Sequence, residues 1–405
     1  MFVSKKRDTP LSPGRIAWKK FRSTPSAMVA LIWIVFSVFI TLTGYLITPD
    51  STPFANNQNI ELSAKKPGFE ATFLKVKKNT FVAEPSWIRT LIRGRPTKFE
   101  EVPVTSYRIE DDVIIVNKHT GYNEIEGMEL AFKLADVAYS IDSTRTRGQR
   151  VWIYPLEGEP EVVGIEELQQ KVEDKHIKNR TYLLGTDRFG RDLLSQIIIG
   201  TRVSLSVGFI AISIALVLGV ILGSLAGFFR GRTDNFIVWL INVVWSIPTL
   251  LLVIAITFAL GKGFWQIFIA VGLTMWVDVA RVVRGQIISL RENEYVEAAR
   301  ALGLPNINII TKHILPNITG PIVVISAANF ASAILIEAGL SFLGIGVQPP
   351  MPSWGNMIRE NYGFIILDKA YLAIIPGICI MLLVMSFMLV GNGLRDALDK
   401  SPLNY

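Results

Sequence analysis

The residues of this chain that could do chemistry are few, and their spacing does not build a catalytic centre. The three histidines, His119, His176 and His313, have no pairwise spacing suited to a metal site. The single cysteine, Cys379, can form neither an intrachain disulfide nor a thiolate metal cluster. The sequence has no Gly-x-Ser-x-Gly elbow, zinc motif or Walker-type phosphate loop. We therefore predict no catalytic residue, no metal and no cofactor.

An acidic residue inside an apolar run, Glu337, is the polar group that most needs an explanation. A charged acid at mid-span costs about 2.5–3.5 kcal/mol on membrane-insertion scales, so it should face a bundle interior or a water-filled path. Asn329 falls near the same helical face, whereas Ser332 is offset from it. Two interpretations stay open: these residues line a translocation path, or they bond neighbouring helices. Asp278 lies near Arg281 and Arg284 at the inner end of another apolar run, and an i, i+3 ion pair is the favoured role for it over that of a substrate ligand.

Membrane spans are the elements that would position these groups. Of the 405 residues, 50% are hydrophobic and only 19% are charged, which is unusual for a soluble domain. Pro248 should kink the third apolar run, and Gly219, Gly223 and Gly227 repeat every fourth position on one face of the second, which suits close helix packing. Six runs reach the ~20 apolar residues that a bilayer requires: 27–47, 203–229, 236–260, 264–283, 318–343 and 371–394.

The distribution of basic residues predicts the orientation. Basic residues outnumber acidic ones before the first run, and they recur near residues 230, 281–300 and 395, so both termini should be cytoplasmic. This topology also explains the net charge of +7, because no basic patch carries the interleaved aromatics of a nucleic-acid site. The first run lacks a small-x-small cleavage site and is not predicted to be a signal peptide.

Residues 49–196 would then lie on the outer side, and they are numerous enough to fold. Residues 113–116 and 151–154 have strand patterns, whereas 128–140 and 165–175 have helical periodicity. We predict a small α+β domain that begins with a polar linker at 52–66. It would either dock another protein or be an elaboration without a function of its own.

A short amphipathic helix is predicted between the fourth and fifth runs. Acidic residues begin it, where the helix dipole favours negative charge, and Gly303 supplies a left-handed stop before Pro305. Tyr295, Ala299 and Leu302 share one face. The helix is too short to cross a bilayer. It would present the small residues Ala298 and Ala299 to a closely packing partner, or lie in the loop without one.

These residues also carry a family resemblance. Glu297-Ala298-Ala299, Gly303 and the Leu315-Pro316 pair resemble the EAA loop of permease subunits of ABC importers. Three further matches lie at 184–192, 340–355 and 393–399, and the first contains Gly185, Thr186, Asp187, Gly190, Arg191 and Asp192. His313 replaces the Ile of the general importer pattern, as is usual in the peptide branch. Together the four segments resemble the second permease of the dipeptide/oligopeptide/nickel branch, outside residues 56–179.

The resemblance implies an all-α polytopic membrane protein of the type I ABC importer permease kind, with six transmembrane helices and the inserted α+β domain. Its regions would be a cytoplasmic tail at 1–26, a first transmembrane helix at 27–48, the extracytoplasmic insertion at 49–196, a five-helix core at 197–394 with the EAA loop at 285–317, and a cytoplasmic tail at 395–405. The expected location is the bacterial inner membrane.

The same resemblance implies partners and roles. The residues expected to couple to an ATPase are Glu297, Ala298, Ala299, Leu302, Gly303, Leu315 and Pro316. The expected partners are a second homologous permease chain, two cytoplasmic ATPase subunits or domains, an extracytoplasmic solute-binding protein and the lipid bilayer. This chain would not be an enzyme, because it has no phosphate loop. Short peptides are the expected solutes, with nickel complexes or opines as alternatives, since selectivity in this family lies largely in the binding protein.

Two other classes of protein would share some of these features. A membrane receptor with an outer sensor domain would have a basic tail and a folded insertion, but it would normally append a signalling domain after residue 394. A secondary transporter would show internal repeats and intramembrane ion ligands. The sequence has no clear repeat, so the importer permease is the favoured reading.

Overall fold

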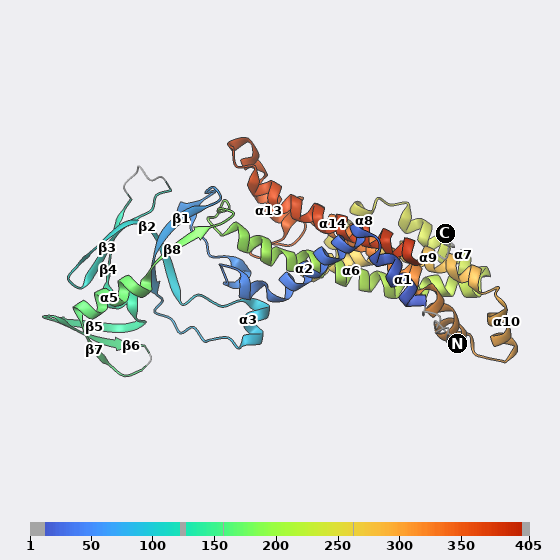
Figure 1. Cartoon of the computed structure of the whole chain (residues 1–405), viewed down its shortest axis with the longest axis horizontal. Helices are drawn as coiled ribbons and strands as arrows, with labels where there is room; N and C mark the ends of the chain where they lie inside the picture. The colour runs from blue at the N-terminus through green and yellow to red at the C-terminus, as the bar shows by residue number, and fades with distance from the viewer. Residues whose placement is uncertain (1–12, 122–126, 157, 262, 399–405) are drawn as a thin grey trace, which may run out of the picture.

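The chain forms an elongated molecule, with two β-sheets at one end and a bundle of long helices at the other (Figure 1). This computed structural model describes residues 13–121, 127–156, 158–261 and 263–398. The outer parts of both predicted tails, residues 1–12 and 399–405, lie outside the described residues.

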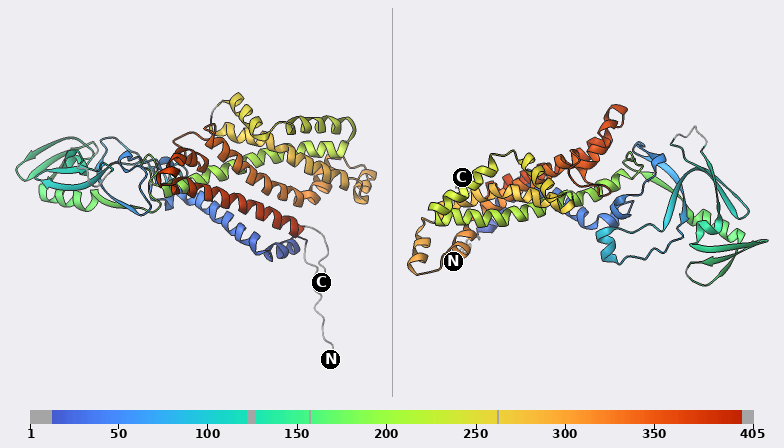
Figure 2. Two further views of the ribbon diagram at one scale, coloured as in Figure 1. Left: turned by 90° about the horizontal axis from the view of Figure 1, so that it is seen from above. Right: turned by 180° about the vertical axis from the view of Figure 1, so that it is seen from behind.

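Five helices in the described part of the chain are long and apolar enough to cross a membrane. They confirm helices at the predicted first, second, fourth, fifth and sixth runs. α2 and α14 lie side by side along one flank of the bundle, where Ala27 and Ala30 pack near Val390 (Figure 2). The bundle contains α1 (Pro13–Arg22), α2 (Pro25–Ile47), α6 (Leu193–Phe229), α9 (Phe264–Leu290), α12 (Thr319–Phe342) and α14 (Tyr371–Leu398).

The predicted third span is broken rather than kinked. α7 (Gly231–Trp245) ends three residues before Pro248, which caps α8 (Thr249–Leu260), and the two helix axes differ by 93°. Proline has no N–H to donate and its ring collides with the carbonyl of the preceding turn, so α7 cannot continue through it. The six-span prediction therefore holds only if α7 and α8 together make one crossing.

Close packing between α6 and α9 organises the bundle, as the glycine spacing predicts. A Cβ at Gly219 would lie 2.5 Å from the Cβ of Val279, and one at Gly223 would lie 2.6 Å from the backbone oxygen of Ala280. At Gly227 it would lie 2.9 Å from a backbone oxygen of α9. The two backbones approach this closely because glycine has no side chain.

Loops that are far apart in the sequence meet at the end of the bundle opposite the sheets. Arg230, after α6, pairs with Glu292, after α9, at 2.6 Å, and Arg291 donates to the carbonyl oxygen of Phe228 at 2.5 Å. The α10 helix (Glu294–Ala301) lies at this end (Figure 1). The basic loops assigned to one side of the membrane are thus grouped in space.

At the other end, all strand pairs are antiparallel. The larger sheet has the order β4-β3-β2-β1-β8, and the smaller has the order β5-β6-β7. The α5 helix (Ile165–His176) covers their shared core through Leu168 and Val172. The strands are β1 (Phe69–Lys77), β2 (Phe99–Glu110), β3 (Val113–Lys118), β4 (Glu129–Lys133), β5 (Ile141–Arg147), β6 (Arg150–Pro155), β7 (Glu161–Gly164) and β8 (Ile177–Tyr182).

Three of the four local predictions in this region are confirmed: the strands at 113–116 and 151–154 are β3 and β6, and the helix at 165–175 is α5. The helix predicted at 128–140 is wrong in its first half, which is β4; only α4 (Leu134–Ala138) is helical. Leu130 and Phe132 alternate with exposed residues and pack on the sheet core, so the period of two outweighs the helical pattern.

Residues 52–66 are folded and packed rather than the polar linker that their composition suggested. Two short turns of 3-10 helix, at Pro53–Ala55 and Ile60–Leu62, fold this segment. Ala55, Leu62 and Ala64 are buried, and so is the polar Asn59. The segment packs closely because its backbone is bonded to a distant loop, which belongs to the site described below.

We predict that Gly223→Ala destabilises the α6–α9 pair. Its methyl group would overlap the Ala280 carbonyl, and overpacking costs about 1–3 kcal/mol. Gly285→Ala is the matched control, since a Cβ there meets nothing within 4 Å and alanine favours a helix by about 1 kcal/mol. Thermal unfolding of the purified chain in detergent should show a lower midpoint only for Gly223→Ala. Equal midpoints would contradict the close packing.

Candidate functional site

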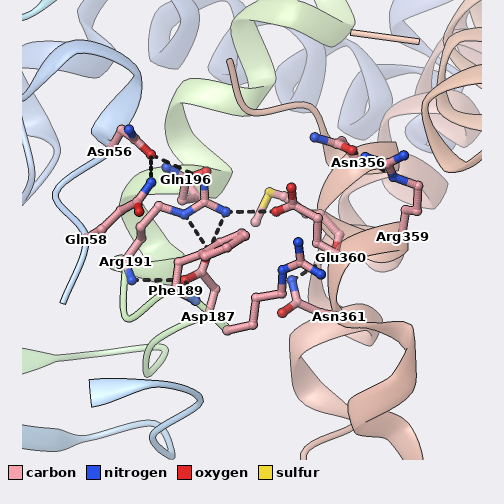
Figure 3. Close-up of polar contacts among 12 residues, drawn as sticks. Asn56, Gln58, Asp187, Phe189, Arg191, Gln196, Asn356, Arg359, Glu360 and Asn361 are labelled. Carbon is pink, nitrogen blue, oxygen red and sulfur yellow. Dashed lines mark hydrogen bonds and ion pairs between the residues drawn. The ribbon is translucent and has the colours of Figure 1, made fainter. Parts of the chain in front are cut away.

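A buried network of charges joins the base of the sheets to the helical bundle (Figure 3). Asp187 accepts from the backbone N–H groups of Phe189 and Arg191, both at 2.9 Å, and from Nε of Arg191 at 2.6 Å. Nη2 of Arg191 then reaches Oε2 of Glu360 at 2.8 Å. The three side chains are at most 5% exposed. Glu360 belongs to α13 (Trp354–Asn361), so this triad binds the β8–α6 connection to α13.

The same connection holds residues 50–66 in place. Lys65 N donates to Thr186 Oγ1 at 2.8 Å, and Asn59 N donates to the carbonyl oxygen of Phe189 at 3.1 Å. Gly185 and Gly190 have φ of +79° and +70°, and a Cβ at either would overlap a carbonyl oxygen of this segment. Glycine is therefore required at both positions for conformation and for space.

Asp192 anchors the first turn of α6. Its Oδ2 accepts from Ser195 N at 2.9 Å, and Ser195 Oγ accepts from Asp50 N at 3.0 Å. Burial raises the pKa of Asp192 above its usual range, although the bonds from Ser195 oppose that shift. The cap satisfies backbone donors at a helix start that water does not reach.

A second acid, Glu101, ties the larger sheet to this base. Glu101 accepts from Arg180 at 2.8 Å and Asn57 at 2.6 Å, and pairs with Lys75 at 3.2 Å. Burial acts to raise the pKa of Glu101, but Arg180 and Lys75 outweigh it and hold that pKa below its usual range. The paired charges thus join β1, β2 and β8 to one another, and the Asn57 amide links this sheet to the segment at the base.

The structure brings the 184–192 motif together as a buried connection between the sheets and the bundle, and not as an open site. Its predicted site residues are all buried: Gly185, Thr186, Asp187, Gly190, Arg191 and Asp192. Sequence reasoning missed Glu360 and Gln196; the Gln196 amide donates to the carbonyl oxygen of Phe54 at 2.9 Å. The only signal for Glu360 was its place just after the 340–355 match, and no spacing rule pairs it with Arg191.

The EAA-like loop lies at the far end of the molecule. The α10 helix (Glu294–Ala301) confirms the predicted short helix, and Gly303 has φ of 73°, which confirms the left-handed stop. Val296 and Ala299 are buried in the hydrophobic core formed with Phe228, and the Arg300 guanidinium lies 5.1 Å from the centre of the Phe228 ring. Ala299 therefore faces the helical bundle, and only Ala298 of the alanine pair faces outward.

The outward surface of this loop is partly apolar. Leu302 is 80% exposed and Ile307 is 64% exposed, and the acidic Glu297 is exposed beside them. Beyond Pro305 the chain continues as short helical turns, α11 (Asn306–Asn308), Ile309–Ile314 and Leu315–Ile318, that lead into α12. Leu315 is half-buried and Pro316 is exposed.

The three polar residues predicted to line a path do not come together. Glu337 is 0% exposed, and it accepts from Ser341 Oγ at 2.6 Å, while Ser341 Oγ accepts from Val347 N at 3.2 Å. This burial favours the packing role that the sequence left open for Glu337. Asn329 is also buried, whereas Ser332 lines a cavity of about 270 Å³. A translocation role for any of them stays a prediction.

The ion pair expected between Asp278 and Arg281 is not formed. The Arg281 guanidinium instead lies 3.6 Å from the centre of the Trp245 ring, and in the described ranges no hydrogen bond or ion pair holds Asp278. Nor do the described residues contain three His, Cys, Asp or Glu side chains grouped closely enough to hold a metal ion.

The bundle of spanning helices, with a surface helix between two of them, defines a polytopic membrane permease. Residues 219–402 match the family described as the binding-protein-dependent transport system inner membrane component, and residues 12–67 match the N-terminal transmembrane domain of oligopeptide transport permease C. The chain belongs to the family of binding-protein-dependent transport permeases, in the dipeptide/oligopeptide branch, and is a multi-pass inner-membrane protein.

Similar proteins include two permeases of peptide transport systems. The dipeptide transport system permease protein DppC of Alkalihalophilus pseudofirmus is 43% identical over 215 residues, which cover 53% of this chain and 70% of that protein. The oligopeptide transport system permease protein OppC of Bacillus subtilis is 40% identical over 222 residues, which cover 55% and 72%. A chain of the inward-facing MetNI methionine ABC transporter aligns with a TM-score of 0.43 at 19% identity, over 51% of this chain and 98% of that chain.

We predict that Arg191→Leu loosens the joint between the sheets and the bundle. It would leave the buried carboxylates of Asp187 and Glu360 without their shared cation, and breaking a buried pair costs about 3–5 kcal/mol. Arg188→Leu is the control, because Arg188 is exposed and its loss should change stability by about 0.5 kcal/mol or less. Similar thermal midpoints for the two variants in detergent would rule out a structural role for the triad.

Proposed function

We propose that this chain is the permease subunit of an ATP-driven importer and forms half of a translocation path. The solutes are peptides or similar small molecules, delivered by a solute-binding protein. Permeases named for dipeptides and oligopeptides are its relatives, which supports this solute class. The observation that carries the proposal is α10, a capped helix held on the bundle with an exposed apolar tip.

The two faces of α10 suit it to coupling. Val296 and Ala299 fasten its inner face to the core of the bundle, while Ala298, Leu302 and Ile307 are free on the outer side to enter a groove of an ATPase subunit. An apolar anchor in a pocket surrounded by charge is the usual core of a protein interface. Two such ATPase subunits or domains hydrolyse the ATP, and this chain is not itself an enzyme.

Movement of α10 passes into the bundle through paired charges as well as packing. Glu292 precedes α10 and pairs with Arg230 at 2.6 Å, and Arg284 on α9 binds Asp234 on α7 through two bonds at 2.6 and 2.7 Å. When the ATPase subunits close, α10 and the attached ends of α9 and α12 move together. The path then alternates between inward-facing and outward-facing states.

The exposed faces of the bundle leave room for the other partners. α7 and α8 expose large apolar side chains over much of their length, among them Trp239 and Phe258. Lipid and a second homologous permease chain cover such faces, and the path runs between the two permeases. With the basic loops on the cytoplasmic side, both termini are cytoplasmic. The sheets then lie outside, where they guide the binding protein onto the permease.

We expect Gly303→Val to uncouple the ATPase. Valine rarely adopts a positive φ, so the stop after α10 should be lost while the chain still inserts. Gly231→Val is a matched control: Gly231 also has positive φ, at 58°, and a Cβ at either glycine meets nothing within 4 Å. In the reconstituted complex, transport-stimulated ATPase activity should fall only for Gly303→Val. Normal coupling in that variant would refute the assignment of this loop.

The topology can be tested with single cysteines at Asp142 and Asn306 in a Cys379→Ala background. Both positions are exposed, one in β5 and the other after α10. An impermeant thiol reagent should label Asp142→Cys in intact cells and Asn306→Cys only after permeabilisation. Labelling of both from the same side would disprove the proposed orientation.

A further inference from the structure

Asp278 lies within the fourth predicted span, residues 264–283, toward its inner end. On the neighbouring α12 (Thr319–Phe342), Ser332 lies near the middle of the helix. Asp278 is exposed on the surface of this single chain. A carboxylate inside a span is costly where it faces lipid, so the surface that carries Asp278 must face water or protein in the complete transporter.

Among the residues that the structure describes, none holds the Asp278 side chain by a hydrogen bond or an ion pair. Arg281, one turn away, attracts the carboxylate only at longer range, because its guanidinium is stacked on Trp245. Glu337, the other acid within the spans discussed above, is sealed inside the chain and bonded to Ser341. Of these two acids, Asp278 is the one that a solute could reach.

Asp278 also lines a cavity in which the hydroxyl groups of two neighbouring residues can accept hydrogen bonds. The cavity, about 270 Å³, lies where α9 and α12 meet the α7–α8 break. Its hydroxyl groups include those of Thr274 and Ser332, which donate their protons to carbonyl oxygens of their own helices, at 2.8 and 3.2 Å. Each hydroxyl oxygen therefore has only lone pairs left to offer.

One carboxylate and two acceptor hydroxyls suit a positively charged nitrogen. We propose that Asp278, Thr274 and Ser332 form a cation-binding site in the translocation path, which takes an ammonium group of the solute, such as the α-amino group of a peptide. The site rests on the proposed transport function and deepens it, because it makes Asp278 a specificity-determining residue. The apolar side chains of Leu252 and Ile336, which also line the cavity, would contact the carbon atoms next to that nitrogen.

The test measures the local electrostatic potential and needs no knowledge of the natural solute. Ser332→Cys in a Cys379→Ala background is assembled with the partner permease and ATPase subunits in lipid nanodiscs. Its rates of modification by cationic trimethylammonioethyl methanethiosulfonate and anionic sulfonatoethyl methanethiosulfonate are compared, without nucleotide and with ATP plus vanadate. The ratio of the two rates is then measured again after Asp278→Asn and, as the control acid, after Glu337→Gln.

We expect the cysteine to react in at least one nucleotide state and to prefer the cationic reagent. Asp278→Asn should lower the rate ratio about tenfold, because one nearby charge acts oppositely on the two reagents, and Glu337→Gln should leave it unchanged. An unreactive cysteine, as would follow if the partner permease covered the cavity, would overturn the site. So would a ratio that Asp278→Asn does not alter. Failure of the complex to assemble or to hydrolyse ATP would instead contradict the proposed function.

Discussion

The close contact between α6 and α9 is the interaction on which the rest of the structure depends. α6 has 37 residues and is about 55 Å long, so one helix reaches from the Asp192 cap at the sheets to Phe228 beneath α10. α9 carries Asp278 at its middle and Arg284 near its end. Three glycines let these two helices pack at backbone distance, so that the buried network at the sheets and α10 are attached to one closely packed helix pair.

The two acids within the spans, Asp278 and Glu337, have opposite surroundings in this membrane protein. Glu337 is enclosed near the end of α12, where Ser341 of the same helix donates to the carboxylate and accepts from the backbone N–H of Val347 in the loop that follows. Asp278 stands on the opposite kind of surface, beside a break in the neighbouring span that opens a cavity. Because hydrocarbon offers no hydrogen bonds, each acid needs protein or water around it, and the helix packing decides which of the two it obtains.

Local patterns in the sequence predicted the features that are held locally. Hydropathy located the spanning helices, and the Gly303 and Pro305 breakers located the end of α10. The failures arose where distant residues decide the outcome. Residues 52–66 look like a polar linker because the groups that hold them, Thr186 and Phe189, lie more than 120 positions away. The i, i+3 rule likewise failed for Asp278, because Trp245 on another helix offers Arg281 a better contact.

The pairing of β1 with β8 has an evolutionary consequence. Phe69, at the start of the sheet-bearing segment, lies opposite Tyr182, at its end, and paired strands are about 5 Å apart. The chain thus leaves and re-enters the base of the bundle at almost the same point. Of the two regions that match the family, the first stops at residue 67, just before the start of β1 at Phe69. An ancestor could therefore have acquired the whole segment between Phe69 and Tyr182, or a descendant could shed it, without displacing a single membrane helix.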